Sequence, residues 1–270
     1  MSGKLVTDAP LAHLRWGDTG PVVVLMHGVG GGREAWGDAA SGTGAALAAA
    51  GFQALSIDFP GYGLSSAIEP YDLAGMARSV GRLIDSTGSS AAVLVGHSMG
   101  GMVAQELAAT TPERVSALVL ASTSPAFGKP GGEWQQGFLQ SRFAPLDAGL
   151  GMAGLAAQLV PTMLAPGVSP ERRDAARALM AGVPEATYRR AVRALVAFDR
   201  RANLPALRMP TLVITGEHDR TAAPEVAARM AERIAGSQLL IVPGAGHLLN
   251  IEQPEAFNGA LLRFLEGAFT

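Results

Sequence analysis

The sequence predicts a doubly wound α/β fold, in which a mostly parallel β-sheet carries helices on both faces. Short runs rich in valine, leucine and isoleucine end in glycine or a polar turn, and within them apolar residues do not alternate with polar ones. Such runs are typical of parallel strands buried on both faces. Segments with helical spacing lie between them, and one long stretch, residues 125–208, interrupts the alternation.

The expected elements follow the chain in a regular order. Six runs are expected to form strands, at residues 21–28, 52–61, 91–98, 115–123, 210–219 and 238–247. Four segments are expected to be helices because their apolar residues recur at helical spacing. Each of them ends at glycine or proline, or begins near a proline. They are residues 71–88, 99–112, 223–236 and 253–267. Residues 125–208 hold only helical patterns, so we expect a helical cap there and a core formed by 1–124 and 209–270.

Composition narrows the classes of function. The chain has 270 residues, of which 48% are hydrophobic and 16% charged, and its formal net charge is −2. No basic face for nucleic acid is visible. Without cysteine, disulfides and thiolate metal sites are excluded. No apolar run reaches the ~20 residues of a membrane span, and the first residues do not look like a signal peptide. We therefore expect a soluble, cytoplasmic protein that binds neither nucleic acid nor membrane; its oligomeric state stays open.

The segment "VGHSMGG" lies between an expected strand and an expected helix. A serine there can simply cap the helix, but a cap does not explain Gly96 and Gly100. The pattern G-x-S-x-G requires small residues because the strand-to-helix turn is very tight, and the turn exposes the hydroxyl of Ser98 at the carboxyl edge of the sheet. Ser98 is therefore the predicted nucleophile.

A serine hydroxyl needs a base, and the base needs an orienting acid. In this architecture the acid and then the histidine follow the serine along the chain, each just after a strand. His247 in "VPGAGH" fits the base, and Asp219 in "LVITGEHD" fits the acid, with Glu217 as its competitor. The sequence therefore predicts a triad of Ser98, Asp219 and His247.

The stretch "HGVGGG" follows the first expected strand. It lacks the spacing of a nucleotide-binding glycine motif and the Lys-Ser/Thr of a P-loop. In a hydrolase such a loop supplies one of two N–H donors for the oxyanion, and the residue after the nucleophile supplies the other. We expect Val29 and Met99 to be these donors. His27 is expected to shape the loop, and His97 to pack or hydrogen-bond near the serine.

Together these motifs resemble the α/β-hydrolase superfamily. "HGVGG", "DFPGYGLSS", "GHSMGG", "PTLVITGEHD" and "GAGH" occur in the order of that family. The resemblance implies a cap over the active site and a catalytic centre without metal or organic cofactor. The loop from Asp58 to Ser65 looks like the family's structural turn, so no chemistry is assigned to it. Within the family, a serine nucleophile disfavours haloalkane dehalogenases and epoxide hydrolases, which carry aspartate there.

The predicted cap carries the information on substrate. Its apolar residues are expected to give an apolar pocket with few polar anchors, although residues at helical spacing usually pack against one another. The candidate pocket residues are Trp134, Phe138, Phe143, Leu146, Met163 and Phe198. Arg142, Arg189 and Arg190 can meet a substrate carboxylate, but solvent-facing positions are favoured for them.

The predicted function is hydrolysis of a small, fairly apolar carboxylic ester or lactone through an acyl-enzyme. One alternative is C–C bond hydrolysis of a vinylogous diketone, which the same triad serves. The meta-cleavage hydrolases that perform it often have asparagine at the position of His97, which lowers this alternative. A second alternative is a receptor that binds a small ligand without turnover. An intact triad argues against it, because a pure binder has no chemical need for all three groups.

Overall fold

The computed structural model describes residues 2–128 and 131–269. Its centre is an eight-stranded sheet with the strand order β1-β2-β4-β3-β5-β6-β7-β8. Strands β3 to β8 are parallel neighbours, and only β2 runs antiparallel to its partners. The mostly parallel α/β fold predicted from the apolar runs is therefore confirmed. The strands are β1 Lys4–Val6, β2 His13–Trp16, β3 Val22–Met26, β4 Gln53–Ile57, β5 Ala92–His97, β6 Val115–Ala121, β7 Thr211–Gly216 and β8 Gln238–Val242.

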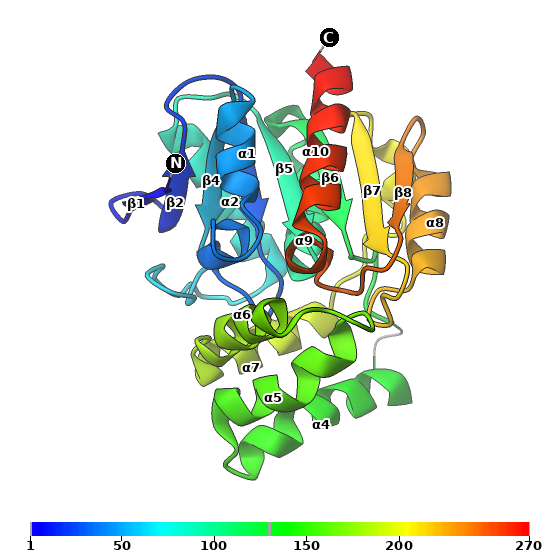
Figure 1. Cartoon of the computed structure of the whole chain (residues 1–270). Coiled ribbons are helices and arrows are strands. Elements are labelled where there is room, and N and C mark those ends of the chain that lie inside the picture. The colour runs from blue at the N-terminus through cyan, green and yellow to red at the C-terminus, as the bar shows by residue number, and fades with distance from the viewer. Residues whose placement is uncertain (1, 129–130, 270) are drawn as a thin grey trace.

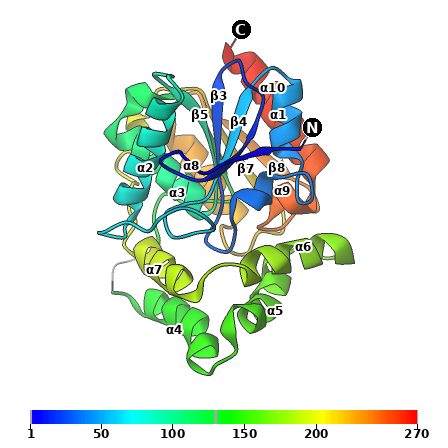
Figure 2. The same ribbon diagram turned by 90° about the vertical axis from the view of Figure 1, so that its left-hand side faces the viewer.

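Helices cover both faces of this sheet (Figure 2). On one face lie α2 Leu73–Ser86, α3 Met99–Thr110 and α8 Pro224–Arg233; on the other lie α1 Thr43–Ala49 and α10 Pro254–Phe269. The sheet thus separates two apolar clusters, because alternate residues of each buried strand point to opposite faces. The one-turn helix α9 Leu249–Glu252 directly precedes α10.

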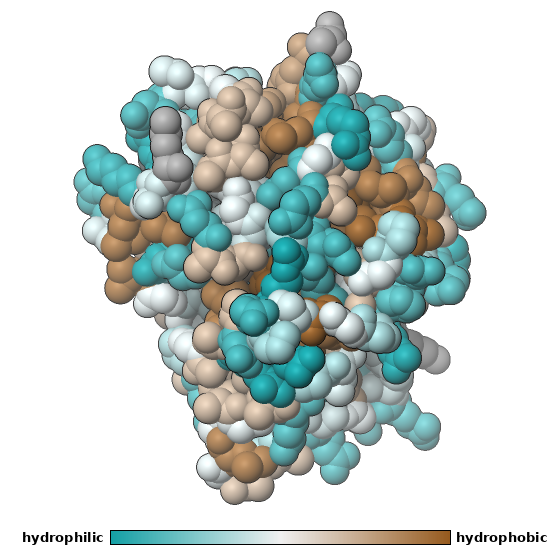
Figure 3. All heavy atoms as spheres, in the orientation of Figure 1, coloured by the Kyte–Doolittle hydropathy of each residue, from teal (hydrophilic) through white to brown (hydrophobic). Residues whose placement is uncertain are grey.

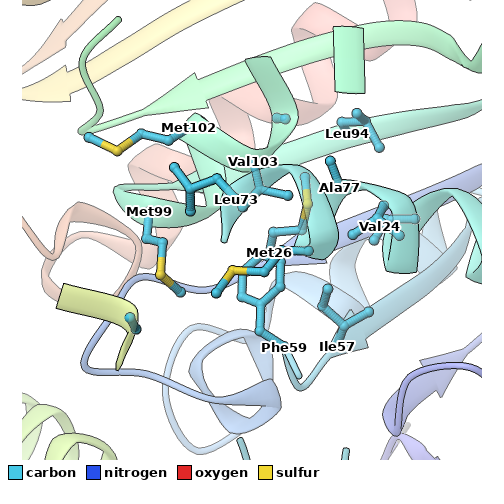
Figure 4. Close-up of a cluster of buried hydrophobic side chains, with 14 of the residues drawn as sticks. Val24, Met26, Ile57, Phe59, Leu73, Ala77, Leu94, Met99, Met102 and Val103 are labelled. Carbon is cyan, nitrogen blue, oxygen red and sulfur yellow. The ribbon is translucent and has the colours of Figure 1, made fainter. Parts of the chain in front are cut away.

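Figure 4 shows part of the larger cluster, where the side chains of Met26 and Met99 point toward one another beside Phe59. All three side chains are fully buried. This packing joins the end of β3, the start of α3 and the loop after β4 below the carboxyl edge of the sheet. The same three segments carry the predicted site.

Four helices are inserted between β6 and β7: α4 Glu133–Asp147, α5 Gly151–Met163, α6 Pro170–Ala181 and α7 Glu185–Val196. They form a layer beyond the carboxyl edge of the sheet (Figure 1). The insertion has a narrow neck, where Phe127 N–H donates to Phe198 O at 2.9 Å and Arg200 N–H donates to Pro125 O at 2.7 Å. The 3-10 helix Leu204–Ala206 follows this neck and lies against α8, so it is on the sheet side, although the sequence placed it in the insertion.

At the far edge of the sheet, β8 leaves apolar side chains uncovered. Leu239 and Ile241 are 42% and 40% exposed, and a hydrophobic area is visible over this edge in Figure 3. This edge lies away from the insertion. None of the helices in the described part of the chain is long and apolar enough to cross a membrane.

The loop after β4 is fixed by the carboxylate of Asp58, which is almost fully buried. It accepts hydrogen bonds from the backbone N–H of Arg33 (3.0 Å) and of Leu64 (3.1 Å) and forms an ion pair with the Arg33 guanidinium. Ser65 Oγ donates to the Asp58 carbonyl at 2.8 Å and accepts from Ala12 N–H at 2.9 Å. These contacts hold the loop against the segment after β3, which is the structural role expected for it.

The ion pair of Asp58 gives a stability prediction. Asp58→Asn removes the buried counter-charge of the Arg33 guanidinium, whose side chain is only 17% exposed, and leaves it only the Glu34 carboxylate at 3.3 Å, which is 58% exposed. We expect the free energy of unfolding to fall by about 3–5 kcal/mol, measured by urea denaturation. Asp85→Asn is the matched control, because that carboxylate pairs with Arg114 while 61% exposed, and should cost no more than about 1 kcal/mol. Equal losses in the two variants would contradict this assignment.

Candidate active site

Ser98 lies at the turn between β5 and α3, and its backbone is strained. Its φ is 52° and its ψ is −115°, a conformation that residues other than glycine rarely adopt. The turn is held by Ser98 N–H, which donates to Ala121 O at 2.9 Å, and by Thr123 Oγ1, which donates to Ser98 O at 2.7 Å. Ala121 is the last residue of β6 and Thr123 lies just after it, so the end of the neighbouring strand and the loop that follows it fix the position of the serine.

The two glycines of the motif permit this turn for a measurable reason. A Cβ at Gly96 would lie 2.4 Å from the backbone of Gly100, and a Cβ at Gly100 would lie 2.3 Å from Met26 O. Side-chain atoms do not approach backbone atoms this closely, so α3 can start against β3 and β5 only with glycine at both positions. The steric explanation inferred from the sequence applies in the structure.

The structure brings Ser98, His247 and Asp219 together. His247 Nε2 lies 3.2 Å from Ser98 Oγ, and His247 Nδ1–H donates to Asp219 at 2.9 Å from Oδ2 and 3.1 Å from Oδ1. Because a carboxylate only accepts, the proton of the neutral imidazole is on Nδ1 and the lone pair of Nε2 faces the serine. This arrangement can remove the proton from the serine hydroxyl.

Asp219 rather than Glu217 reaches the histidine. Asp219 is 2% exposed, and its Oδ1 accepts from the N–H of Thr221 and of Ala222, both at 2.8 Å. Burial acts to raise the pKa of Asp219, but the neighbouring His247 and these hydrogen bonds outweigh it and hold the pKa below its usual value. The Glu217 side chain is 55% exposed and accepts from Gly244 N–H at 3.0 Å, away from the histidine.

The glycine-rich loop after β3 is oriented by bonds to its carbonyls. Gly28 O accepts from His27 Nδ1–H at 2.7 Å and from Gly31 N–H at 3.0 Å, while Tyr62 Oη donates to Val29 O at 2.9 Å. A peptide group whose carbonyl is held on one side directs its N–H to the other side. The N–H of Val29 has no partner among the described residues, and Val29 lines the same cavity as Ser98.

Met99 contributes its backbone rather than its side chain. It is the first residue of α3, so its N–H has no intrahelical acceptor, and no other described group accepts from it. Its side chain is fully buried in the apolar cluster. The N–H next to the Ser98 hydroxyl therefore remains available to a ligand.

His97 supports the histidine loop. Its Nε2–H donates to His247 O at 2.8 Å, and the two rings lie 5.1 Å apart. Burial, together with the neighbouring His247, lowers the pKa of His97 to about 3, so its ring is neutral. This agrees with a packing and hydrogen-bonding role and excludes a charged His97 beside His247 at neutral pH.

The loop that carries His247 is also tied to the insertion. His247 N–H donates to Met163 O at 2.8 Å, at the end of α5. Glu252, which is buried, accepts from Gly246 N–H (3.0 Å) and Leu248 N–H (2.9 Å) on either side of the histidine and from Ala165 N–H (2.7 Å) in the insertion. One carboxylate thus joins α9, the histidine loop and the segment after α5.

A cavity of about 90 Å³ lies between Ser98 and the inserted helices. Its walls are mainly apolar, and no carboxylate side chain lines it among the described residues. Of the six predicted pocket residues, Phe138 and Met163 line it. No cluster of three or more potential metal-ligating side chains occurs at residues 2–128 or 131–269.

The other four predicted pocket residues lie elsewhere. Leu146 of α4 and Phe198, which follows α7 in the chain, are both buried in the larger apolar cluster. Phe143 lies under the guanidinium groups of Arg189 and Arg193. Trp134 is 61% exposed, stacks on Phe138 and lines an outer groove rather than the cavity.

Comparison with known proteins agrees with this geometry. The family model described as "alpha/beta hydrolase fold" matches residues 21–254, most of the chain.

The chain belongs to the alpha/beta hydrolase family.

Among curated proteins, this hydrolase is 33% identical to a putative carbamate hydrolase RutD of Variovorax paradoxus, over 91% of the chain and 92% of that protein. It is 32% identical to the polyketide synthase ThaQ of Burkholderia thailandensis, over 94% of the chain, which spans only 12% of that much longer protein. Among solved structures, a thermophilic esterase of Thermogutta terrifontis, described with malate bound, superposes with a TM-score of 0.86 at 28% identity, and both chains are covered completely.

Several residues at the site of this hydrolase were not singled out by the sequence. Tyr62, which holds the glycine-rich loop, lies in a loop that was given no chemistry, and Glu252 lies in a one-turn helix that was not expected. Tyr188 and Met180 line the cavity from α7 and α6. A buried tyrosine or carboxylate gives no signal in the sequence until its hydrogen-bond partners are known.

The buried histidines predict how stability depends on pH. Burial lowers the pKa of His27 to about 4 and that of His97 to about 3, from an ordinary value of 6.5. Below pH 6.5 the unfolded chain therefore takes up protons that the folded protein does not. The contribution of these two histidines to the free energy of unfolding should be constant above pH 6.5. It should fall as the pH decreases from 6.5 toward 4.

His97→Asn removes one of these groups. Between pH 6.5 and 4, the free energy of unfolding of the variant should therefore fall less steeply than that of the parent protein. The difference between the two slopes should be up to about 1.4 kcal/mol per pH unit. The measurement is urea denaturation across this range. His218→Asn is the control, because the side chain of His218 is 44% exposed, and its slope should equal that of the parent protein. An unchanged slope in His97→Asn would show that His97 is not a neutral buried group.

Proposed function

We propose that this hydrolase cleaves a carboxylic ester or lactone of a small, fairly apolar substrate through an acyl-enzyme on Ser98. The observation that carries the proposal is the continuous chain from Ser98 Oγ to His247 (3.2 Å) and from His247 to Asp219 (2.9 Å). Ser98, at one end of this chain of contacts, lines a mainly apolar cavity. The names of the esterase and carbamate hydrolase given above support bond cleavage at an acyl carbon.

In the first half of the proposed reaction, Ser98 Oγ attacks the carbonyl carbon while His247 Nε2 takes the hydroxyl proton. The resulting imidazolium donates to the Asp219 carboxylate, which stabilises it without itself being protonated. When the tetrahedral intermediate collapses, His247 gives the proton to the leaving alkoxide oxygen. The alcohol departs, or in a lactone stays attached to the acyl chain, and Ser98 carries the acyl group.

In the second half, His247 takes a proton from water, and the hydroxide attacks the acyl carbon. Collapse of this intermediate breaks the bond to Ser98 Oγ, which regains its proton from His247. The carboxylic acid is released. The histidine returns to its starting tautomer because the hydrogen bond to Asp219 keeps the other proton on Nδ1 throughout.

We assign the oxyanion of both intermediates to the N–H groups of Val29 and Met99. Both lie beside Ser98, and neither has another acceptor among the described residues. Fixed donors that face developing charge need no reorganisation when the charge forms, and removing one such donor typically costs about 2.7–4 kcal/mol. The bonds to Gly28 O fix the peptide group that carries the Val29 N–H, and the bond from Tyr62 Oη to Val29 O fixes the next peptide group of the loop.

We assign to the inserted helices, with the predicted extent of residues 125–208, the role of a cap that excludes water and shapes the acyl pocket. Phe138 and Met163 are the predicted pocket residues that support this role, because both line the cavity above Ser98. An apolar wall favours an acyl group that leaves water and strengthens the electrostatic contacts inside.

The test is turnover of a short p-nitrophenyl ester, with an aliphatic lactone and a carbamate in the same panel. Ser98→Ala should lower kcat by about 10⁶-fold, to the level left by binding and the oxyanion donors. The matched control is Ser122→Ala, because Ser122 is also a buried serine with positive φ (46°) and follows the adjacent strand β6, but does not line the cavity. Retained turnover in Ser98→Ala, or equal loss in both variants, would contradict the proposal.

A further inference from the structure

One arginine side chain, that of Arg142, lines the mainly apolar cavity. Arg142 of α4 lines the catalytic cavity and also an outer groove of about 710 Å³. The two spaces share only Phe127, Phe138, Arg142 and Thr221 as lining residues among those described. The guanidinium therefore lies where the catalytic cavity meets the outer groove, and this groove is open to the solvent.

Arg142 has no counter-charge. Its Nη1 donates to Ser141 Oγ at 3.2 Å, and the guanidinium carbon lies 4.7 Å from the centre of the Phe138 ring. No carboxylate pairs with it in the described part of the chain. Burial lowers the pKa of Arg142, but an arginine side chain remains protonated. Its remaining donors are thus available to a ligand.

Other arginines nearby do have partners. Arg189 contacts Asp147 at 2.7 Å and Glu185 at 2.8 Å, and Arg200 contacts Glu106 at 2.5 Å. Arg193 lies over Phe143, as Arg142 lies over Phe138, but Arg193 is exposed to water and lines neither space. A half-buried guanidinium that lacks both a carboxylate and full hydration is costly to the folded protein unless a ligand completes it.

The outer groove has the same sign of charge. Arg173, Arg177 and Arg220 line it together with His218, and no Asp or Glu side chain does so among the described residues. Outside the lining, Asp174 lies 3.8 Å from Arg177 and Glu217 lies 3.9 Å from His218. A groove lined by one sign of charge concentrates ligands of the opposite sign. The protein as a whole has a formal charge of −2, so this positive region is a local feature.

We infer that the substrate of this hydrolase is an ester that carries a free carboxylate, which Arg142 binds while Ser98 attacks the ester carbonyl. This inference rests on the proposed function, because it names the substrate class of the same site. The guanidinium fork matches a carboxylate with two parallel N–H···O bonds. Between the two ends, the apolar wall formed by residues such as Leu159 and Met163 accommodates a methylene chain.

The experiment compares two matched series of esters. One series is the monomethyl esters of linear dicarboxylic acids from succinate to suberate, and the other is the methyl esters of the fatty acids with the same chain lengths. The readout is the ratio of kcat/KM for the charged ester to kcat/KM for its neutral counterpart. The parent protein should prefer the charged ester by about 10- to 100-fold at the best length, as expected for a hydrogen bond to a charged group.

Arg142→Met removes the charge but keeps an unbranched side chain over Phe138, and it should reduce this ratio to about one. Arg193→Met is the matched control and should leave the ratio as in the parent protein. Preference for the neutral ester in the parent protein, or an unchanged ratio in Arg142→Met, would overturn the inference while leaving the proposed hydrolysis intact.

A second measurement separates the two proposals. Ser98→Ala protein is titrated calorimetrically with the free dicarboxylates from succinate to suberate, with and without Arg142→Met. Binding that requires Arg142 supports the carboxylate site even if neither ester series is hydrolysed, a result that would count against the proposed function alone. Absence of Arg142-dependent binding to every dicarboxylate would count against the inference.

Discussion

The close approach of α3 to strands β3 and β5 is the constraint on which the site depends. Because Gly96 and Gly100 have no Cβ, their backbones come within the distance that any side chain would block, and the turn between them places Ser98 at a positive φ of 52°. The chain passes from β3 to β4 on one side and then returns to β5 on the other, so the loops after β3 and β5 meet at the point where open α/β sheets bind ligands. The positions of Ser98, of the proposed oxyanion donors Val29 and Met99 and of the cavity all depend on that junction.

The second feature of the site is that the histidine loop is shared between the sheet and the inserted helices. Glu252 accepts three backbone N–H groups, two beside His247 and one at Ala165 after α5. His247 N–H also donates to Met163 O. A displacement of α5 would therefore move the histidine relative to Ser98. In the proposed reaction, a substrate that packs on the insertion would thus affect the geometry of proton transfer. Arg142 extends the same logic, because it reaches the cavity from the insertion and binds the proposed carboxylate from that side.

The sequence predicted the sheet well because buried parallel strands leave a strong apolar signal. It placed Ser98, Asp219 and His247 each after an expected strand, and the structure brings these three side chains together. Strands β1 and β2 have only three and four residues and partly exposed side chains, too little for a pattern. The pocket was predicted less well. Helical spacing shows that Phe138 and Phe198 lie on apolar faces, but the packing of the helices decides that Phe138 lines the cavity and Phe198 does not. Arg142 could not be distinguished from Arg189 in the sequence. Only the folded structure shows that Arg189 pairs with two carboxylates, whereas no carboxylate among the described residues pairs with Arg142.

The central claim is that the strained serine between the two glycines is the nucleophile. It is tested most directly by peptide mapping with mass spectrometry after reaction with a fluorophosphonate, which forms a stable covalent bond with an activated serine. We expect one adduct per chain, on the peptide that contains Ser98. No adduct should form when Asp219 and His247 are both replaced by alanine, because the hydroxyl then has no base. An adduct on another residue, or no adduct in a preparation that hydrolyses esters, would contradict it.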